Sequence, residues 1–448
     1  MSTFDSITYL ARNTPYWGLQ RITSREPAST FANKEISVTE GWMHNVKMPS
    51  GAGAGVTVYV LESSLNKDFL DIESERLEIL EETKFDSSNK TPQTMHGTIV
   101  ANILGGTTFG TAPKAKIVMV PKPPPSKFPA NDPNSRKGLK IAYDLVIEHF
   151  KKTRPKYAIV NVSQGTDAST VDDAVDYCDR IQTILDLGIL FISAAGNGAT
   201  RINKETREEY RAYWDLFTQY REHRTKQNIT NTFESTARDI FLINKKLETL
   251  KNAGTITPEI QGQIEELNKL KEDSNAVADK LNKLKKSEMK IPSGWPGVLS
   301  VGASDVFDSC DKQFHGSGVD IYAPGFVIPF ITDSTKKTYE YVYTSESKDL
   351  KRLQGTSFAS PTTSGAVACL ISARAAANLP PWTQAQMRDE LFASARVIKT
   401  GEDFYKILCI VKKLPNKQVA VIAPTKVPVT DTVEDKKKPH GKSKESPL

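Results

Sequence analysis

Apolar and polar positions between residues 56 and 200 follow two alternating periods. Short runs of β-branched and aliphatic residues predict buried strands, and the longer stretches between them have apolar residues at helical spacing. The predicted strands are VTVYVL (56–61), KIVMV (116–120), YAIVNVS (157–163) and ILFIS (189–193). The predicted helices are HGTIVANILGG (96–106), GLKIAYDLVIEHFKK (138–152) and VDDAVDYCDRIQTILDLG (171–188). This βαβ order predicts an α/β fold with a mostly parallel sheet and helices on both faces.

The same pattern returns after Pro292. VLSVGAS (298–304) and VDIYAPG (319–325) are further predicted strands, and SFASPTTSGAVACLISARAAA (357–377) is a predicted helix of small residues. WTQAQMRDELFASA (382–395) predicts another helix, and FYKILCIVKK (404–413) and KQVAVIAP (417–424) predict two closing strands. Both halves of the chain therefore contribute to one α/β domain.

The segment between the halves, residues 201–290, is rich in Lys, Glu, Asn, Gln and Leu. Residues 236–252 and 257–286 predict two antiparallel helices, the second capped by Thr257 with Pro258 at its first position. Charges of alternating sign indicate a solvated face and not a binding patch. We therefore predict three parts. These are a discontinuous α/β domain (1–200 and 291–424), an inserted helical hairpin (201–290) and a disordered Lys-rich tail (425–448).

Composition narrows the class of protein. The chain has 448 residues, of which 38% are hydrophobic and 25% charged, an ordinary composition for a folded, soluble protein. No apolar run is long enough to span a membrane, and a net charge of +6 is too small to argue for nucleic acid. The N-terminus lacks the pattern of a signal peptide, and four widely spaced cysteines fit neither a zinc site nor a disulfide framework. We expect a cytoplasmic protein, or a secreted one if the chain is a trimmed precursor.

Four polar residues lie where this fold places chemistry. Glu62 ends a predicted strand, and parallel sheets hold functional groups beyond the carboxyl ends of their strands. His96 and Ser357 each begin a predicted helix, and Asn197 follows the strand ILFIS. An acid, a base and a hydroxyl are the three groups of a serine nucleophile system. Taken singly, each has a simpler interpretation: a solvated acid, a structural histidine, a helix cap and a turn.

Taken together, the stretches HGT-x-VA, AAGN and GTS-x-ASP resemble the histidine, oxyanion and serine motifs of the subtilisin-like serine proteases. TPYWGLQRIT, GAGAGVTVYVLESS, NVSQG, IPSGWPGVLSVGASD and GVDIYAPG are similar to stretches of the proteinase-K-like fungal branch. The resemblance covers residues 14–200 and 291–397. It implies a subtilisin-like fold and a serine endopeptidase.

The resemblance also assigns roles. Ser357 would attack the scissile carbonyl, His96 would take its proton, and Glu62 would orient His96. Asn197 and the backbone N–H of Ser357 would stabilise the oxyanion. The residues implied to bind substrate are Ser163, Gln164, Gly165, Ala194, Ala195 and Gly196. The resemblance implies no certain cofactor and allows a structural calcium ion.

Several features depart from the family pattern. Glu62 stands where the family has Asp, and Ser64 where it has Gly. KPPPSKFPANDPNS (122–135) replaces a glycine-rich strand of the substrate cleft, and its prolines cannot donate backbone hydrogen bonds. The insertion borders the pocket for the substrate residue before the cut, so we expect the hairpin to overhang that pocket and to offer a surface to a regulatory partner. No inhibitory prodomain is recognisable.

These observations predict a serine endopeptidase with a restricted choice of protein or peptide substrate. Intracellular fungal members of the family act in regulated cell death, which makes such a role one implication of the resemblance. Two alternatives stay open. One is a catalytically weak member that serves as a binding or scaffold module, and the other is a peptide-processing enzyme of a biosynthetic pathway.

Overall fold

The computed structural model describes fourteen segments of the chain: residues 6–26, 44–87, 95–123, 138–167, 171–197, 236–252, 256–283, 290–305, 308–310, 318–326, 328–333, 338–341, 353–400 and 403–411. Within them, a large sheet has the strand order β14-β15-β11-β10-β8-β6-β3-β5-β4. Its neighbouring strands are parallel except for the pair β14–β15. Its strands are β3 (Thr57–Glu62), β4 (Leu77–Ile79), β5 (Lys116–Pro121), β6 (Ala158–Val162), β8 (Leu190–Ala194), β10 (Leu299–Ser304), β11 (Ile321–Pro324), β14 (Arg396–Thr400) and β15 (Asp403–Ile407).

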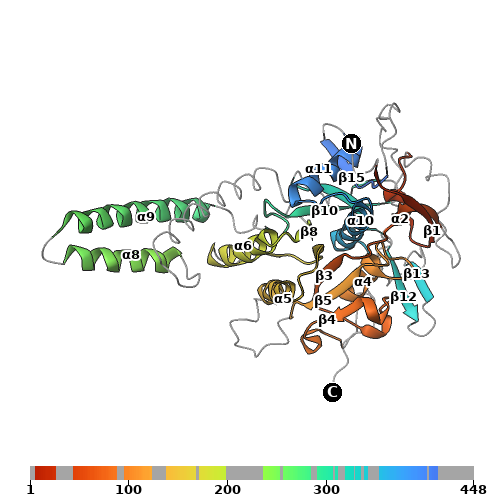
Figure 1. The fold of residues 1–448 in the computed structure, drawn as a ribbon, viewed down its shortest axis with the longest axis horizontal. Helices are drawn as coiled ribbons and strands as arrows, with labels where there is room; N and C mark the ends of the chain where they lie inside the picture. The colour runs from red at the N-terminus through yellow and green to blue at the C-terminus, as the bar shows by residue number, and fades with distance from the viewer. Residues whose placement is uncertain are drawn as a thin grey trace, which may run out of the picture.

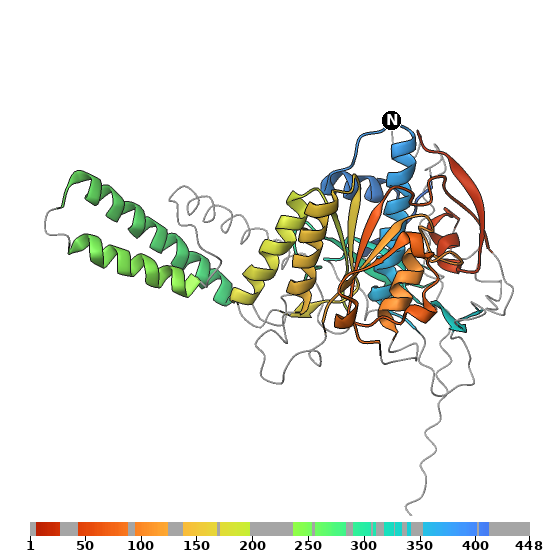
Figure 2. The ribbon, with the colours of Figure 1, turned by 60° about the horizontal axis from the view of Figure 1, so that its bottom comes forward.

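Helices cover both faces of this sheet (Figures 1 and 2). One face carries α4 (His96–Gly105) and α10 (Thr356–Ala376), and the other carries α5 (Gly138–Thr153) and α6 (Val171–Asp186). The apolar side chains form two core clusters, one on each side of the sheet. Strand β3 separates them, and all six of its residues are buried. The predicted α/β architecture is confirmed.

Helix α10 is buried along most of its length because small side chains let it lie close to the sheet. It packs against β10, β8, β11 and β6 as well as against α4. Asn161, in the middle of β6, accepts hydrogen bonds at its Oδ1 from Ser360 Oγ (2.8 Å) and Ser364 Oγ (2.9 Å). Its Nδ2 donates to Ser163 Oγ at 3.0 Å. This fully buried set of polar bonds fixes α10 relative to the strand beside it.

Smaller elements complete the domain. Helices α2 (Trp17–Ile22) and α11 (Gln384–Ser394) lie near its edges, and α11 begins with a capping box between Thr383 and Gln386. The short strand pairs are β1 (Tyr9–Thr14) with β2 (His44–Pro49), β12 (Pro329–Asp333) with β13 (Thr338–Tyr341), and β7 (Thr166–Asp167) with β9 (Lys290–Ile291). Three 3₁₀ turns follow β3 in the chain: η1 (Lys67–Phe69), η2 (Ser74–Arg76) and η3 (Glu82–Lys84).

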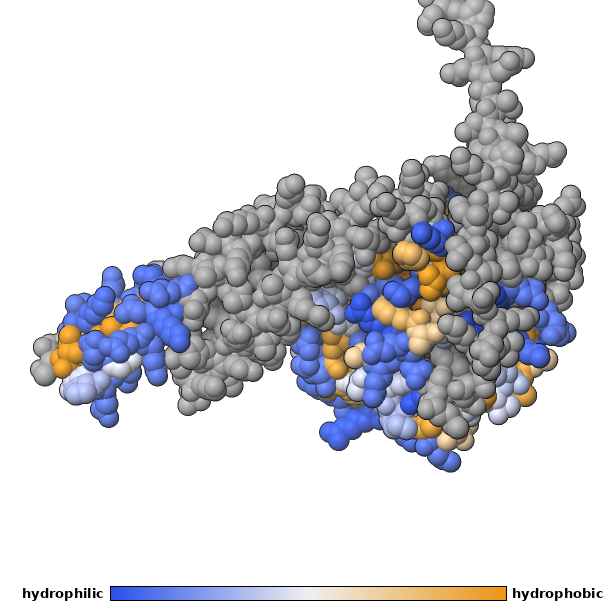
Figure 3. Space-filling view, turned by 90° about the horizontal axis from the view of Figure 1, so that it is seen from above, coloured by the Kyte–Doolittle hydropathy of each residue, from blue (hydrophilic) through white to orange (hydrophobic). Residues whose placement is uncertain are grey.

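Two helices form the hairpin, α8 (Thr236–Lys251) and α9 (Pro258–Lys283). Helix α9 begins at Pro258 as predicted, and Thr257 Oγ1 accepts from the Ile260 N–H at 3.3 Å. Leu247, Ile264 and Leu267 form a small core of their own, and the described surface of the hairpin is largely hydrophilic (Figure 3). The exact domain boundaries remain a prediction, and residues 201–235 lie outside the described segments.

Helices α8 and α9 extend away from the sheet domain beyond α6 (Figures 1 and 2). The predicted overhang of the pocket falls partly on residues 201–235 and 284–289, which lie outside the described segments, and it stays a prediction. One expectation needs correction. The first closing strand is shorter than predicted, because after Ile407 the chain leaves β14 and the Ile410 N–H donates to Ile22 O at the end of α2. The predicted second closing strand and the Lys-rich tail lie outside the described segments.

Among the described residues, no helix is both long and apolar enough to cross a membrane. The four cysteines, Cys178, Cys310, Cys369 and Cys409, are all free thiols, and three of them are buried.

Candidate active site

Glu62 is the last residue of β3 and its side chain is 0% exposed. The interpretation of this acid as a solvated strand end is therefore wrong. A carboxylate buried this completely needs hydrogen bonds to offset its lost hydration. Its Oε2 receives two of them, from His96 Nδ1 at 3.0 Å and from Gln164 Nε2 at 2.5 Å.

His96 is the first residue of α4, and Gly97 lets this helix approach the end of β3. A Cβ on Gly97 would lie 2.1 Å from Ser64 O and 2.8 Å from Glu62 Cβ, closer than packed atoms come. The Gly97 N–H also donates to Ser64 Oγ at 3.2 Å. The departure from the family at position 64 thus supplies a hydrogen bond that holds the start of α4 in place.

The pKa of His96 reflects opposing influences. Burial lowers it, but the charge of Glu62 and the hydrogen bond from Nδ1 together outweigh burial, so the pKa is raised above 6.5. The positive charge of Lys122 opposes this rise. Because Nδ1 carries the proton donated to Glu62, the neutral imidazole has its lone pair on Nε2. That is the tautomer of a general base.

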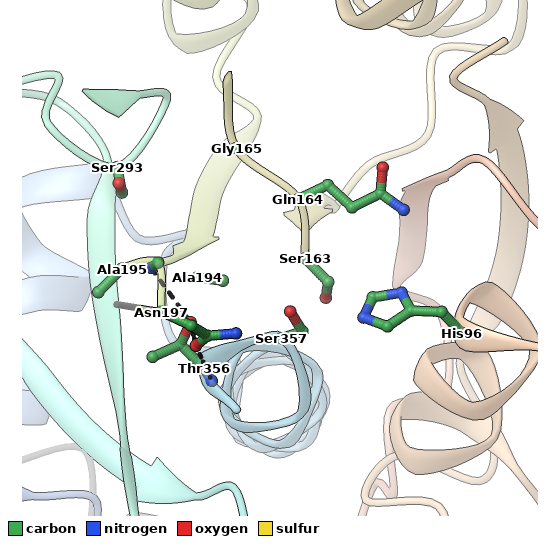
Figure 4. Close-up of a pocket in the computed structure, with 11 residues that line it drawn as sticks. His96, Ser163, Gln164, Gly165, Ala194, Ala195, Asn197, Ser293, Thr356 and Ser357 are labelled. Carbon is green, nitrogen blue, oxygen red and sulfur yellow. Dashed lines mark hydrogen bonds between the residues drawn. The ribbon is translucent and has the colours of Figure 1, made fainter. Parts of the chain in front are cut away.

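Ser357 lies in the first turn of α10, on the opposite side of the site from α4. Figure 4 shows its hydroxyl between Asn197 and His96, with one imidazole nitrogen turned toward it. The next residue, Phe358, is buried and lies against the imidazole, with 5.5 Å between the ring centroids. Packing of Phe358 thus helps to hold the His96 ring beside the serine.

Asn197 follows β8 and faces Ser357 from the other side (Figure 4). Its Oδ1 accepts from the backbone N–H of Thr356 at 3.0 Å and from Thr356 Oγ1 at 2.9 Å. The Gly196 N–H in turn donates to Thr356 Oγ1 at 3.1 Å. Because donors hold the amide oxygen, the amide nitrogen is the end left to face the pocket as a hydrogen-bond donor.

These residues surround a pocket of about 330 Å³. All the residues predicted to bind substrate line it, together with His96, Asn197 and Ser357. Glu62 lies behind this lining. Two further lining residues, Ser293 and Thr356, were not predicted, although both stand within the quoted stretches IPSGWP and GTS. A motif gives the chemistry of its central residue but not the contacts of its neighbours.

In the described segments, no group of three or more His, Cys, Asp or Glu side chains is placed to hold a metal ion. The structural calcium ion stays an expectation from the resemblance, and no step in the chemistry of this site depends on it.

The comparison with protein families agrees with this geometry. A family model described as Subtilase family matches residues 53–233 and 268–435, well over half of the chain. The chain belongs to the subtilase family.

Similar curated proteins include Proteinase T of Parengyodontium album, 29% identical over 185 residues, and the cuticle-degrading serine protease of Orbilia oligospora, 29% identical over 192 residues. The aligned parts cover 41% and 42% of this chain. They span 54% and 39% of the length of these relatives.

Solved structures similar to the chain include a cold-adapted subtilisin-like serine proteinase, with a TM-score of 0.49 and 18% identity over 89% of this chain and 99% of that one. Another is the patellamide maturation protease PatA, with a TM-score of 0.43 and 19% identity over 78% of this chain and 89% of that one.

Proposed function

We propose that this protein is a serine endopeptidase in which Glu62, His96 and Ser357 form the catalytic triad. The observation that carries the proposal is the bond from His96 Nδ1 to the buried Glu62 Oε2, beside a pocket that also contains Ser357. A buried acid bonded to a histidine whose second nitrogen faces a serine across an open pocket is the arrangement that activates a hydroxyl.

In the reaction, Ser357 Oγ attacks the carbonyl carbon of the peptide bond and its proton passes to His96 Nε2. The resulting imidazolium is stabilised by Glu62. When the C–N bond breaks, His96 returns the proton to the leaving amine, and water then hydrolyses the acyl-enzyme by the same steps in reverse order.

The negative charge of the tetrahedral intermediate develops on the former carbonyl oxygen. The Asn197 amide nitrogen and the backbone N–H of Ser357 at the start of α10 are the donors proposed for it. Thr356 holds the amide before substrate arrives, so this donor needs little reorganisation during the reaction.

The proposal includes a restricted choice of protein or peptide substrate. β5 ends at Pro121, and in the sequence Lys122 is followed by three prolines. Proline has no backbone N–H, so this run cannot pair with a substrate backbone as a regular strand does.

A fluorophosphonate probe tests the triad without knowledge of the natural substrate. Attack by Ser357 Oγ forms an O–P bond, releases fluoride and passes the hydroxyl proton to His96. We expect intact-protein mass spectrometry to show one phosphonyl group on the wild type and none on Ser357→Ala. Ser74→Ala is the control and should be labelled like the wild type, because Ser74 is exposed and does not line the pocket. A wild-type protein that stays unlabelled would favour the binding-module alternative.

A further inference from the structure

Three neighbouring strands bring Lys122, Glu62 and Gln164 together at one edge of the sheet. Strand β3 lies between β5 and β6, and all three run parallel. Lys122 directly follows β5, Glu62 ends β3, and Gln164 comes two residues after β6. Glu62 is therefore flanked on both sides by a polar side chain from the adjacent strand end.

The side chains form a continuous chain of hydrogen bonds. Lys122 Nζ donates to Gln164 Oε1 at 2.9 Å, and Gln164 Nε2 donates to Glu62 Oε2 at 2.5 Å. The chemistry of the partners fixes the amide orientation, because an ammonium group can only donate and a carboxylate can only accept. The amide oxygen must face Lys122, and the amide nitrogen must face Glu62.

The side-chain amide of Gln164 has few hydrogen-bonding groups left for a substrate. One N–H of its amide is used by Glu62, and Ser63 Oγ accepts from the same nitrogen at 3.0 Å. Its oxygen is held by Lys122. Gln164 lines the pocket, but its amide contacts the acid behind the pocket.

Glu62 depends on this support more than a shorter acid would. A glutamate side chain has one more rotatable bond than an aspartate, so an additional contact is needed to fix its carboxylate. Both observed bonds go to Oε2, and Oε1 is buried with no partner among the described residues. Without Gln164, the bond from His96 would be the remaining hydrogen bond to this carboxylate within the described part of the chain.

We infer that Gln164 and Lys122 are positioning residues that hold the Glu62 carboxylate against His96, with Lys122 acting through the Gln164 amide. The inference rests on the proposed triad and adds two members to its support. The two residues also explain how the site can use an acid one methylene longer than the family's. The hydrogen bond from Gln164 to Glu62 fixes the carboxylate of the longer side chain.

The charges at His96 give the pair a measurable effect on pH dependence. In the described segments, the charged groups that act on His96 are Glu62 at the end of β3 and Lys122 after β5. From α10, the side chains beside it are the uncharged Ser357 and Phe358. Removing the Lys122 charge therefore raises the pKa of His96, and the acid limb of reactivity moves to higher pH.

The test measures the rate of fluorophosphonate labelling of Ser357 against pH in the full chain. Gln164→Met keeps the side-chain length but removes the hydrogen bonds of the amide to Glu62, Lys122 and Ser63. We expect labelling about 10- to 100-fold slower, as for a slightly misplaced catalytic group. Lys122→Met should slow labelling less and should shift the acid limb to higher pH. Gln182→Met is the matched control, because Gln182 also donates to a carboxylate, Asp186 Oδ1 at 2.6 Å, on an exposed helix face.

The outcomes separate this inference from the proposed function. Wild-type rates and pH profiles in both variants would overturn the positioning roles while leaving the triad intact. A Gln164→Met protein with weaker peptide binding but an unchanged labelling rate would make Gln164 a substrate-binding residue and overturn the inference as well. If Gln164→Met does not fold, the labelling rate of Lys122→Met at a pH above its acid limb decides, because the pH shift alone follows from the lost charge. A wild-type protein without labelling at Ser357 would overturn both proposals.

Discussion

At the scale of single residues, Glu62 is fitted into its site by what surrounds it. Its stem lies against the space left by the missing side chain of Gly97, and its Oε2 takes both hydrogen bonds. Complete burial lets its charge act on the imidazole with little screening from water. The acid thus both orients His96 and raises its pKa.

Glu62→Gln tests the effect of the Glu62 charge on the pKa of His96. The substitution removes the charge that raises the pKa of His96, whereas burial and Lys122 continue to lower that pKa. We expect turnover to fall by about 10³- to 10⁴-fold, since an amide also favours the wrong imidazole tautomer. The acid limb of the residual activity should move from above 6.5 to lower pH, which a pH–rate profile measures.

Glu148→Gln, on the exposed face of α5, is the control for this change and should leave the profile unaltered. Full turnover in Glu62→Gln would exclude Glu62 from the triad, and Asp68 and Asp71 would be the next acids to test.

The sequence singled out Glu62, His96, Asn197 and Ser357 because each stands in a short motif, and the structure places them at one site. Their roles in catalysis belong to the proposed function. It did not predict the bonds from Gln164 to Glu62 or from Lys122 to Gln164. Those depend on which strands are neighbours in the sheet and on side-chain conformation, and neither is visible in a local pattern. The anchoring of Asn197 by Thr356 was missed for the same reason.

At the scale of elements, the site depends on how closely α4 approaches β3. The strand ends at Glu62, the helix begins at His96, and Gly97 is the contact point between them. The distance between His96 and Glu62 therefore depends on the position of the whole helix α4 relative to β3.

Gly97→Ala should be destabilising even though alanine is the better helix former. Helix propensity favours alanine by about 1 kcal/mol, but the new Cβ would clash with Ser64 O, and overpacking of this kind typically costs about 1–3 kcal/mol. We expect a lower unfolding temperature and slower fluorophosphonate labelling. Gly262→Ala in α9 is the matched control, because a Cβ there meets open space. Equal stability and labelling in Gly97→Ala would mean that α4 is free to shift.

Most elements of the α/β domain follow from hydrophobic periodicity alone. Their packing against each other does not, as β15 and the hairpin illustrate. The chain after Ile407 has strand-like composition, and the Leu408 N–H still donates to Tyr322 O of β11, but the Ile410 N–H donates to Ile22 O at the end of α2. The apolar residues of the hairpin form a small core of their own, and the direction in which α8 and α9 leave the domain is not visible in their sequence pattern.

At the scale of the whole molecule, the hairpin and the sheet domain have separate cores. None of the buried residues in the hairpin cluster belongs to the two clusters that flank the sheet. Helices α8 and α9 together form an arm on one side of the sheet domain (Figure 1).

Replacing residues 236–283 by a short Gly/Ser bridge should leave the domain folded, because loop length contributes only weakly to the free energy of folding. We expect an unchanged domain unfolding temperature and unchanged fluorophosphonate labelling, with an altered choice of protein substrate measured by N-terminal proteomics. The control is a deletion extended through Ile291, which also removes β9 and should damage the pocket. An insoluble product from the shorter deletion would show that the arm belongs to the core.

The pairing of β7 with β9 fixes the point at which the chain re-enters the domain. Thr166 pairs with Ile291 and Asp167 with Lys290, directly after the pocket residue Gly165 and just before the pocket residue Ser293. Because this pairing holds the chain beside the pocket, we expect the length of the segment before β9 to have little effect on the shape of the pocket. The arm is in this sense an exchangeable module. A fluorescent protein or a binding domain grafted in its place would be joined to the domain through the same pairing of β7 with β9. This gives a route to direct the proposed protease activity toward a chosen target.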